Sequence, residues 1–124
     1  MATIRGRDTT PELAVRRLLH SLGFRFRLYR RDLPGTPDLV LSRHHTVILV
    51  HGCFWHAHRC QRGRKEPRSN IEFWRTKREG NQQRDRRVRA ALRRLGWRVL
   101  VVWECETRQT ERLTEQLLTA LRGP

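Results

Sequence analysis

Two apolar runs constrain the fold most strongly, because each ends directly at residues that can bind a metal. Residues 46–50 and residues 97–103 are nearly continuous apolar segments with the composition of buried strands. The first run leads into residues 51–60, His-Gly-Cys-Phe-Trp-His-Ala-His-Arg-Cys, and the second leads into Glu104 and Cys105. If the two strands lie side by side, their ends bring Cys105 to the 51–60 segment.

The remaining pattern predicts an α/β sandwich with a mixed sheet and helices around it. Thr9 to Glu12 carries a capping-box signature, and Gly23 is a typical helix end. Ser69 to Glu72 repeats the signature, and Gly80-Asn81 favours a bend or an interruption in the helix that follows. The other predicted elements are a half-buried strand over residues 24–29, a strand over 38–41 that forms a hairpin with 46–50, and a last helix over 110–121.

Composition indicates one domain with a polyanionic partner. The chain has 124 residues, with 27 Lys and Arg against 12 Asp and Glu, a net charge of +15. Arg pairs bidentately with phosphate, so the excess of Arg favours nucleic acid over a merely solvated basic surface, although charge does not distinguish DNA from RNA. Residues 1–8 are expected to form a flexible basic arm of this single domain, residues 1–124.

Cysteine usage points to a reducing compartment. The three cysteines are an odd number, no signal-peptide pattern opens the sequence, and no apolar run approaches the roughly 18 residues of a membrane span. We therefore expect a cytoplasmic protein with no membrane partner and with thiols available for metal. We also expect a monomer, because no apolar stripe is left without an intramolecular use.

The cysteines and nearby histidines form a candidate zinc site. A structural zinc takes four ligands, preferably thiolates with imidazole, so the three cysteines are its natural core. Spacing leaves open which histidine is the fourth ligand, and buried free cysteines beside a strand are the alternative interpretation. The six candidates are Cys53, Cys60, Cys105, His51, His56 and His58.

A second metal site is indicated at Asp38, which precedes the hairpin. An acidic residue at the start of one strand and a second group on the next strand are typical of restriction-enzyme-type nucleases, where carboxylates hold Mg²⁺. The usual acidic-x-Lys motif is missing, and Leu49-Val50-His51 stands in its place. A metal here would need the Val50 carbonyl as a ligand and a histidine in the proton-transfer role. The alternative is a turn aspartate that caps a strand.

Five motifs together resemble the very short patch repair (Vsr) DNA mismatch endonucleases over nearly the whole chain. They are residues 5–9 (RGRDT), 33–38 (LPGTPD), 51–60 (HGCFWHAHRC), 73–77 (FWRTK) and 96–105 (GWRVLVVWEC). This family nicks one strand beside the thymine of a T·G mismatch created by deamination of 5-methylcytosine. The resemblance implies a restriction-endonuclease-like fold, a structural zinc and a catalytic Mg²⁺. It also implies the four zinc ligands, which are Cys53, His58, Cys60 and Cys105.

The resemblance further implies roles around the phosphate. Asp38 would bind Mg²⁺ together with the main-chain carbonyl of Val50, where the family often has threonine. His56 would act as general base, and His51 would lie close to the scissile phosphate. Glu12 resembles a family residue that supports the metal and its waters, and its simpler role is the capping box.

Aromatic and basic residues are the expected DNA contacts. Phe54 and Trp55 lie inside the ligand loop, and a wobble mismatch is already poorly stacked, so inserting flat rings there costs less than in paired duplex. We expect Trp97 and Trp103 to fill the core instead. Met1 resembles the family's minor-groove wedge. The full set of expected DNA contacts is Met1, Phe54, Trp55, Trp74, Lys77, Asn81 and Arg84.

Two other functions compete with a nicking enzyme that leaves 5′-phosphate and 3′-hydroxyl ends and that has a mismatch-repair protein as a possible partner. One is a non-catalytic zinc-containing nucleic-acid-binding module, which the missing acidic-x-Lys motif favours. The other is a zinc hydrolase with an open metal site, which the three cysteines disfavour because thiolate-rich sites are closed.

Overall fold

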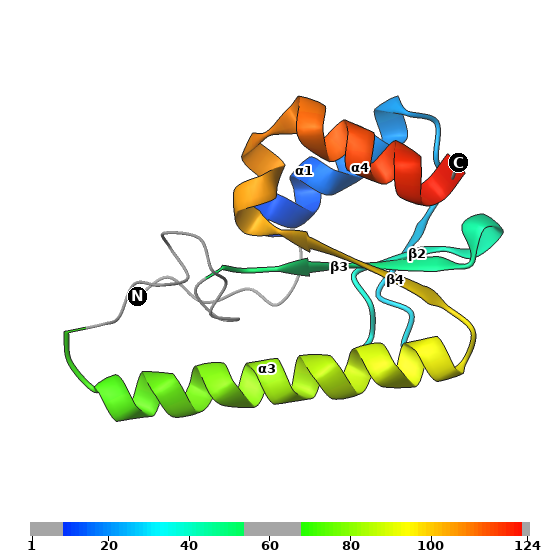
Figure 1. Cartoon of the computed structure of the whole chain (residues 1–124). Helices are drawn as coiled ribbons and strands as arrows, with labels where there is room; N and C mark the ends of the chain where they lie inside the picture. Colours follow the sequence, from blue (N-terminus) through cyan, green and yellow to red (C-terminus); the bar gives the residue numbers. More distant parts are fainter. Residues whose placement is uncertain (1–8, 54–67, 123–124) are drawn as a thin grey trace.

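The computed structural model describes residues 9–53 and 68–122, and a mixed sheet lies at the centre of this part of the chain (Figure 1). Its strands lie in the order β1-β2-β3-β4, with β1 antiparallel to β2, β2 antiparallel to β3, and β3 parallel to β4. The strands are β1 (Arg27–Leu28), β2 (Leu39–Leu41), β3 (Thr46–His51) and β4 (Arg98–Trp103). The predicted α/β class with a mixed sheet is confirmed.

Helices cover both faces of the sheet (Figure 1). Helices α1 (Thr10–Ser21) and α4 (Thr110–Arg122) lie on one face, and the long helix α3 (Ile71–Arg94) lies on the other. Short 3₁₀ turns follow two of the strands, η1 (Ser42–His44) after β2 and η2 (Glu104–Arg108) after β4. In the described ranges, no helix has the length and apolar character needed to cross a lipid bilayer.

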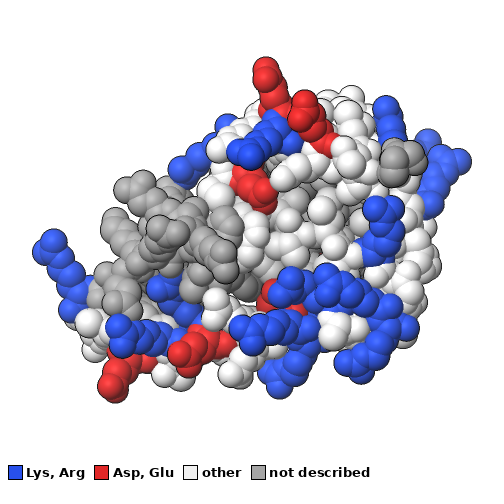
Figure 2. All heavy atoms as spheres, viewed as in Figure 1, with Lys and Arg blue, Asp and Glu red and all other residues white. Residues whose placement is uncertain are grey.

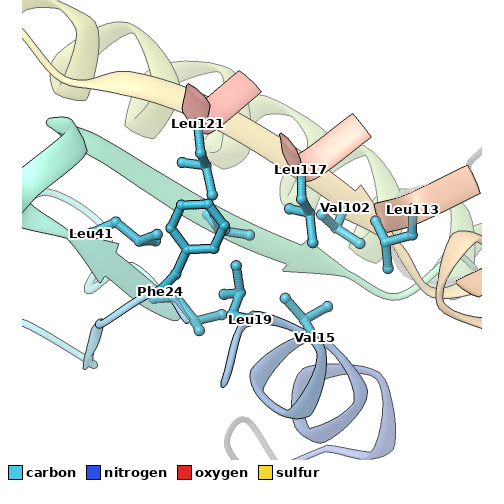
Figure 3. Close-up of a cluster of buried hydrophobic side chains, with 10 residues drawn as sticks. Val15, Leu19, Phe24, Leu41, Val102, Leu113, Leu117 and Leu121 are labelled. Atoms are coloured by element: carbon cyan, nitrogen blue, oxygen red, sulfur yellow. The ribbon is translucent and has the colours of Figure 1, made fainter. Parts of the chain in front are cut away.

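The strands bury side chains on both faces, which explains why β2 and β3 read as continuous apolar runs. Figure 3 shows the larger cluster, where α1, α4 and one face of the sheet meet. On the other face, a smaller cluster joins the sheet to α3. The first cluster includes Val15, Leu19, Phe24, Leu41, Val102, Leu113, Leu117 and Leu121, and the second consists of Leu33, Val40, Val47 and Leu92.

The parallel pairing predicted for the two apolar runs is confirmed. β3 is the central strand between β2 and β4, and Val50 pairs with Val102. At the last step of the register, His51 pairs with Trp103. The residues that follow these two strands therefore emerge at the same edge of the sheet.

The predicted strand over residues 24–29 is largely wrong. Only Arg27 and Leu28 form a strand, and both are exposed. Phe24 packs into the core ahead of the strand, and Tyr29 ends it with a backbone φ of 50°, in the left-handed region. An extended strand cannot continue through that conformation.

Two predictions about α3 are also wrong. The helix runs without interruption through Gly80, since glycine weakens a helix without breaking its hydrogen bonds. The expected capping box at its start does not form, because Asn70 is the N-cap and has φ 55° and ψ 41°. A side-chain cap needs an extended N-cap backbone, which this conformation excludes.

Trp97 and Trp103 are half-buried, so their assignment to the core is only partly correct. Trp97 directly precedes β4 and Trp103 is its last residue, whereas the fully buried residue of that strand is Val102. Trp97 stacks flat on His45, with ring centroids 4.4 Å apart, and the rings of Trp103 and His51 form a T-shaped pair with centroids 5.2 Å apart.

Candidate active site

Two carboxyl groups from distant parts of the chain meet beside the central strand. Asp38 directly precedes β2, and its Oδ2 accepts a hydrogen bond from the backbone N–H of Val50 in β3 at 2.8 Å. Glu12 lies in the first turn of α1, is only 3% exposed, and its carboxyl group lies close enough to Asp38 to raise the pKa of that residue. The hairpin and the first helix therefore build this pair together.

The pair is electrostatically unfavourable when both groups are ionised. Burial raises the pKa of Asp38 to about 7, the Val50 N–H opposes this rise, and the neighbouring Glu12 adds to it through its negative charge and its hydrogen bond. The positive charge of Arg16 offsets a smaller part. A divalent cation would relieve the repulsion, and carboxylate and carbonyl oxygens are the ligands that Mg²⁺ prefers, so these residues fit such an ion.

Glu12 also forms the predicted capping box. Its backbone N–H donates to Thr9 Oγ1 at 3.4 Å, and its Oε2 accepts from the Thr9 backbone N–H at 3.3 Å. The capping interpretation is therefore confirmed, and the same carboxyl group still reaches Asp38. A catalytic role for Glu12 stays a prediction.

His51 lies at the end of β3 and contacts an aspartate that sequence reasoning missed. Its Nε2 is 2.9 Å from Asp85 Oδ1, and Asp85 Oδ2 is 3.1 Å from Arg89 Nε. His51 and Asp85 are both nearly buried. Asp85 sits three residues before Val88 and seven before Leu92, so its place on the buried stripe of α3 was a signal that could have found it.

Cys53 and Cys105 follow β3 and β4 and lie in contact, as predicted. The backbone N–H of Cys105 donates to Cys53 Sγ at 3.4 Å, and Cys53 is fully buried. The carboxylate of Glu104 accepts a hydrogen bond from the Cys53 N–H at 3.3 Å, which ties the two segments together. Two cysteines in contact at the same edge of the sheet fit half of a thiolate-rich zinc site.

Six of the predicted site residues lie outside the part of the chain that the structure describes. In residues 9–53 and 68–122, no three His, Cys, Asp or Glu side chains are grouped so that they could hold a metal ion. The zinc site and its ligand set therefore stay predictions. The predicted site residues outside these ranges are Met1, Phe54, Trp55, His56, His58 and Cys60.

Helix α3 brings four predicted DNA contacts onto one element. Trp74 and Asn81 are half-buried, at helical spacing from Asp85, so they share its side of the helix. Lys77 and Arg84 are exposed on a neighbouring side. The sequence of α3 contains nine Lys and Arg against three Asp and Glu, and Figure 2 shows basic side chains gathered over this helix. The same helix therefore carries both a basic surface and Asp85, the residue that contacts His51.

The fold defines a first class for the protein. Its structure is similar to that of the homing endonuclease I-Bth0305I catalytic domain, with a TM-score of 0.59, covering 91% of this chain and 94% of that one. Sequence identity between the two is 18%, so the likeness is one of fold. It defines the chain as an α/β protein that shares the fold of that domain.

Sequence comparison then identifies the family. The family model described as DNA mismatch endonuclease Vsr matches residues 1–62. The type II nicking enzyme V.XorIIP of Xanthomonas oryzae pv. oryzae is 55% identical over 106 residues, 86% of this chain and 77% of that protein. The DNA mismatch endonuclease Vsr of Escherichia coli K12 is 46% identical over 119 residues, 96% of this chain and 76% of that protein. The chain belongs to the Vsr family and is a nuclease.

Proposed function

We propose that this protein nicks one strand of double-stranded DNA at a T·G mismatch, such as deamination of 5-methylcytosine creates, and so starts very short patch repair. The reaction depends on Mg²⁺ and leaves 5′-phosphate and 3′-hydroxyl ends. The observation that carries the proposal is the buried pair of Asp38 and Glu12 beside the Val50 backbone. Membership of the Vsr family supports it. The substrate is the nucleoid DNA of the cytoplasm, and a mismatch-repair protein is a candidate partner.

Asp38, Glu12 and the carbonyl of Val50 form the proposed magnesium site. Bound there, Mg²⁺ supplies a Lewis acid for the phosphate oxygen and for the attacking water. Asp38 binds the ion through a carboxylate oxygen once it has lost its proton, and its raised pKa makes proton and metal compete. Glu12 holds the metal's waters. Valine in place of the family's usual threonine leaves the carbonyl ligand unchanged.

In this proposal His51 and His56 have different roles near the phosphate. The contact between His51 Nε2 and Asp85 fixes the tautomer and orientation of the imidazole ring. His51 then lies close to the scissile phosphate, while His56 removes a proton from the attacking water as general base. Asp85 acts on the reaction through His51 and is a positioning residue.

A structural zinc anchors the loop that carries these groups. Its ligands are Cys53, His58, Cys60 and Cys105, and the contact between Cys53 Sγ and the Cys105 N–H supports the pairing of two of them. The zinc takes no part in the reaction. It fixes the loop so that its histidines and rings meet DNA in one geometry. The DNA contacts are Met1, Phe54, Trp55, Trp74, Lys77, Asn81 and Arg84.

A nicking assay tests the function. Two end-labelled duplexes that differ only in one T·G mismatch or its T·A counterpart are incubated with the protein, with Mg²⁺ or with EDTA. We expect Mg²⁺-dependent cutting of the thymine strand of the mismatched duplex alone, with ends that DNA ligase can rejoin. Binding without cutting would instead favour a non-catalytic DNA-binding module, and equal cutting of both duplexes would contradict mismatch recognition.

Substitutions test the roles. Asp38→Ala and His56→Ala are expected to lower the nicking rate by at least about 100-fold while mismatch binding and zinc content remain. Asp32→Ala is the matched control for Asp38, because Asp32 lies exposed in the same loop and pairs with Arg30. Loss of folding in the Asp38 and His56 variants would show that they are structural residues.

A further inference from the structure

The carboxyl group of Glu12 is held by more than its capping box. Its Oε2 accepts a hydrogen bond from the hydroxyl of Tyr29 at 2.7 Å and lies 3.6 Å from Nη2 of Arg16. The same Arg16 nitrogen donates to the Tyr29 hydroxyl at 2.5 Å, and the guanidinium stands over the tyrosine ring, 5.5 Å from its centroid. The Thr9 N–H, the Tyr29 hydroxyl and the Arg16 guanidinium therefore all lie at Oε2, which fixes the direction of the carboxyl group.

Tyr29 reaches Glu12 through an unusual backbone conformation. Its φ of 50° lies in the left-handed region, which a bulky residue rarely adopts. Such conformations persist only where the surroundings require them, and they are common at functional sites. Tyr29 directly follows β1, which pairs with β2, and Asp38 directly precedes β2. Because Leu28 pairs with Leu39 in this antiparallel register, Tyr29 and Asp38 emerge at the same end of the strand pair, where Tyr29 reaches Glu12.

We propose that Tyr29 and Arg16 are positioning residues that hold the Glu12 carboxyl group against Asp38, so that a divalent cation meets the two groups in one arrangement. A glutamate side chain has three rotatable bonds, and two ionised carboxylates repel each other. Without the Tyr29 hydroxyl and the Arg16 charge, Glu12 would turn away from Asp38 before the ion arrives. Metal affinity then falls, as it does when groups that orient metal ligands are removed.

The proposal rests on the metal site of the proposed function and concerns the affinity for a divalent cation, not the affinity for DNA. Neither Tyr29 nor Arg16 needs to touch DNA or the metal. A purely structural role for the two residues would instead change folding stability and leave metal affinity unchanged.

The test is Tyr29→Phe, which keeps the ring under Arg16 and removes only the hydroxyl. Mn²⁺ is titrated into the zinc-loaded protein and followed by electron paramagnetic resonance, and the Mg²⁺ concentration for half-maximal nicking is measured in parallel. We expect both to show a loss of about tenfold in metal affinity, with unchanged affinity for the T·G duplex. Ser21→Ala is the control, since it also removes a hydroxyl from a hydrogen bond, at the exposed end of α1.

Wild-type affinity for Mn²⁺ in Tyr29→Phe, with the same Mg²⁺ requirement, would overturn the proposal. Arg16→Gln tests the same contacts from the other side and replaces Tyr29→Phe if that variant fails to fold. Unchanged Mn²⁺ affinity in Arg16→Gln would likewise overturn the proposal. If the wild type itself binds no Mn²⁺ and makes no nick, the proposed function fails as well, which distinguishes the two failures.

Discussion

Replacing Asp38 by asparagine should make the metal-free protein more stable, although it removes a proposed metal ligand. Asparagine has nearly the same shape and keeps an oxygen that can accept the Val50 N–H. It carries no charge at any pH, so it avoids the repulsion with Glu12 and the cost of burying a carboxylate. The Asp38→Asn variant therefore isolates the energetic cost of the charge.

The magnitude follows from the pKa. The Asp38 pKa is about 7 in the folded protein against the ordinary 3.8, a difference of about three. At about 1.4 kcal/mol for one pKa unit, this difference corresponds to a loss of about 4 kcal/mol in the free energy of unfolding when Asp38 is fully ionised. The pKa of Asp38 is raised in the folded protein, so this group costs the wild type no stability below about pH 4, where Asp38 holds its proton in both the folded and the unfolded state. As the pH rises to about 7, the unfolded state loses the proton first, and the free energy of unfolding falls.

Urea unfolding of both proteins in magnesium-free buffer, at about pH 4.5 and about pH 8, measures this difference. We expect similar free energies of unfolding at the lower pH and a variant that is more stable by up to about 4 kcal/mol at the higher pH. Added Mg²⁺ should stabilise the wild type alone. If both proteins change equally between the two pH values, the charge on Asp38 carries no cost and the reasoning is wrong.

Gly35→Ala should lower the free energy of unfolding by about 1–3 kcal/mol in urea titrations, because the new alanine Cβ would lie 2.5 Å from Val88 Cγ1 and the backbone φ is +72°. An unchanged urea midpoint would contradict this close packing. Asp85→Asn should slow nicking at least about tenfold by releasing the orientation of His51, and an unchanged rate and pH profile would exclude that positioning role. Cys105→Ala should release zinc, as measured by a colorimetric chelator, and lower the melting temperature, while retained zinc would remove this residue from the site.

The sheet could be predicted from the sequence because its signals are local. The apolar runs over 46–50 and 97–103 differ from their surroundings in composition, and their burial on both faces leaves few alternatives. The capping box at Thr9 is likewise a pattern within one helical turn. The prediction of a strand over residues 24–29 is wrong because alternation of apolar and polar residues does not reveal a left-handed backbone conformation such as that of Tyr29.

The sequence predicts individual residues of the candidate site but few of the contacts between them. The sequence indicates Asp38 and Glu12 separately, but the proximity of their carboxyl groups depends on how α1 packs over the sheet. The contact of His51 with Asp85 joins residues 34 positions apart, and no local pattern encodes such a pairing. Cys105 could be placed beside the 51–60 segment because a parallel register fixes which strand ends coincide.

The parallel pairing of β3 with β4 also sets the order in which the protein can become active. Between these strands the chain passes through the whole of α3, so their contacts close a loop of about fifty residues. His51 receives Asp85 from that loop, and Cys53 receives Glu104 and Cys105 from beyond it. A chain whose β4 and α4 are still inside the ribosome lacks Glu104 and Cys105, and its α1 lacks the core residues of β4 and α4 against which it packs. The site is therefore complete only after the C-terminal part of the chain has joined the fold.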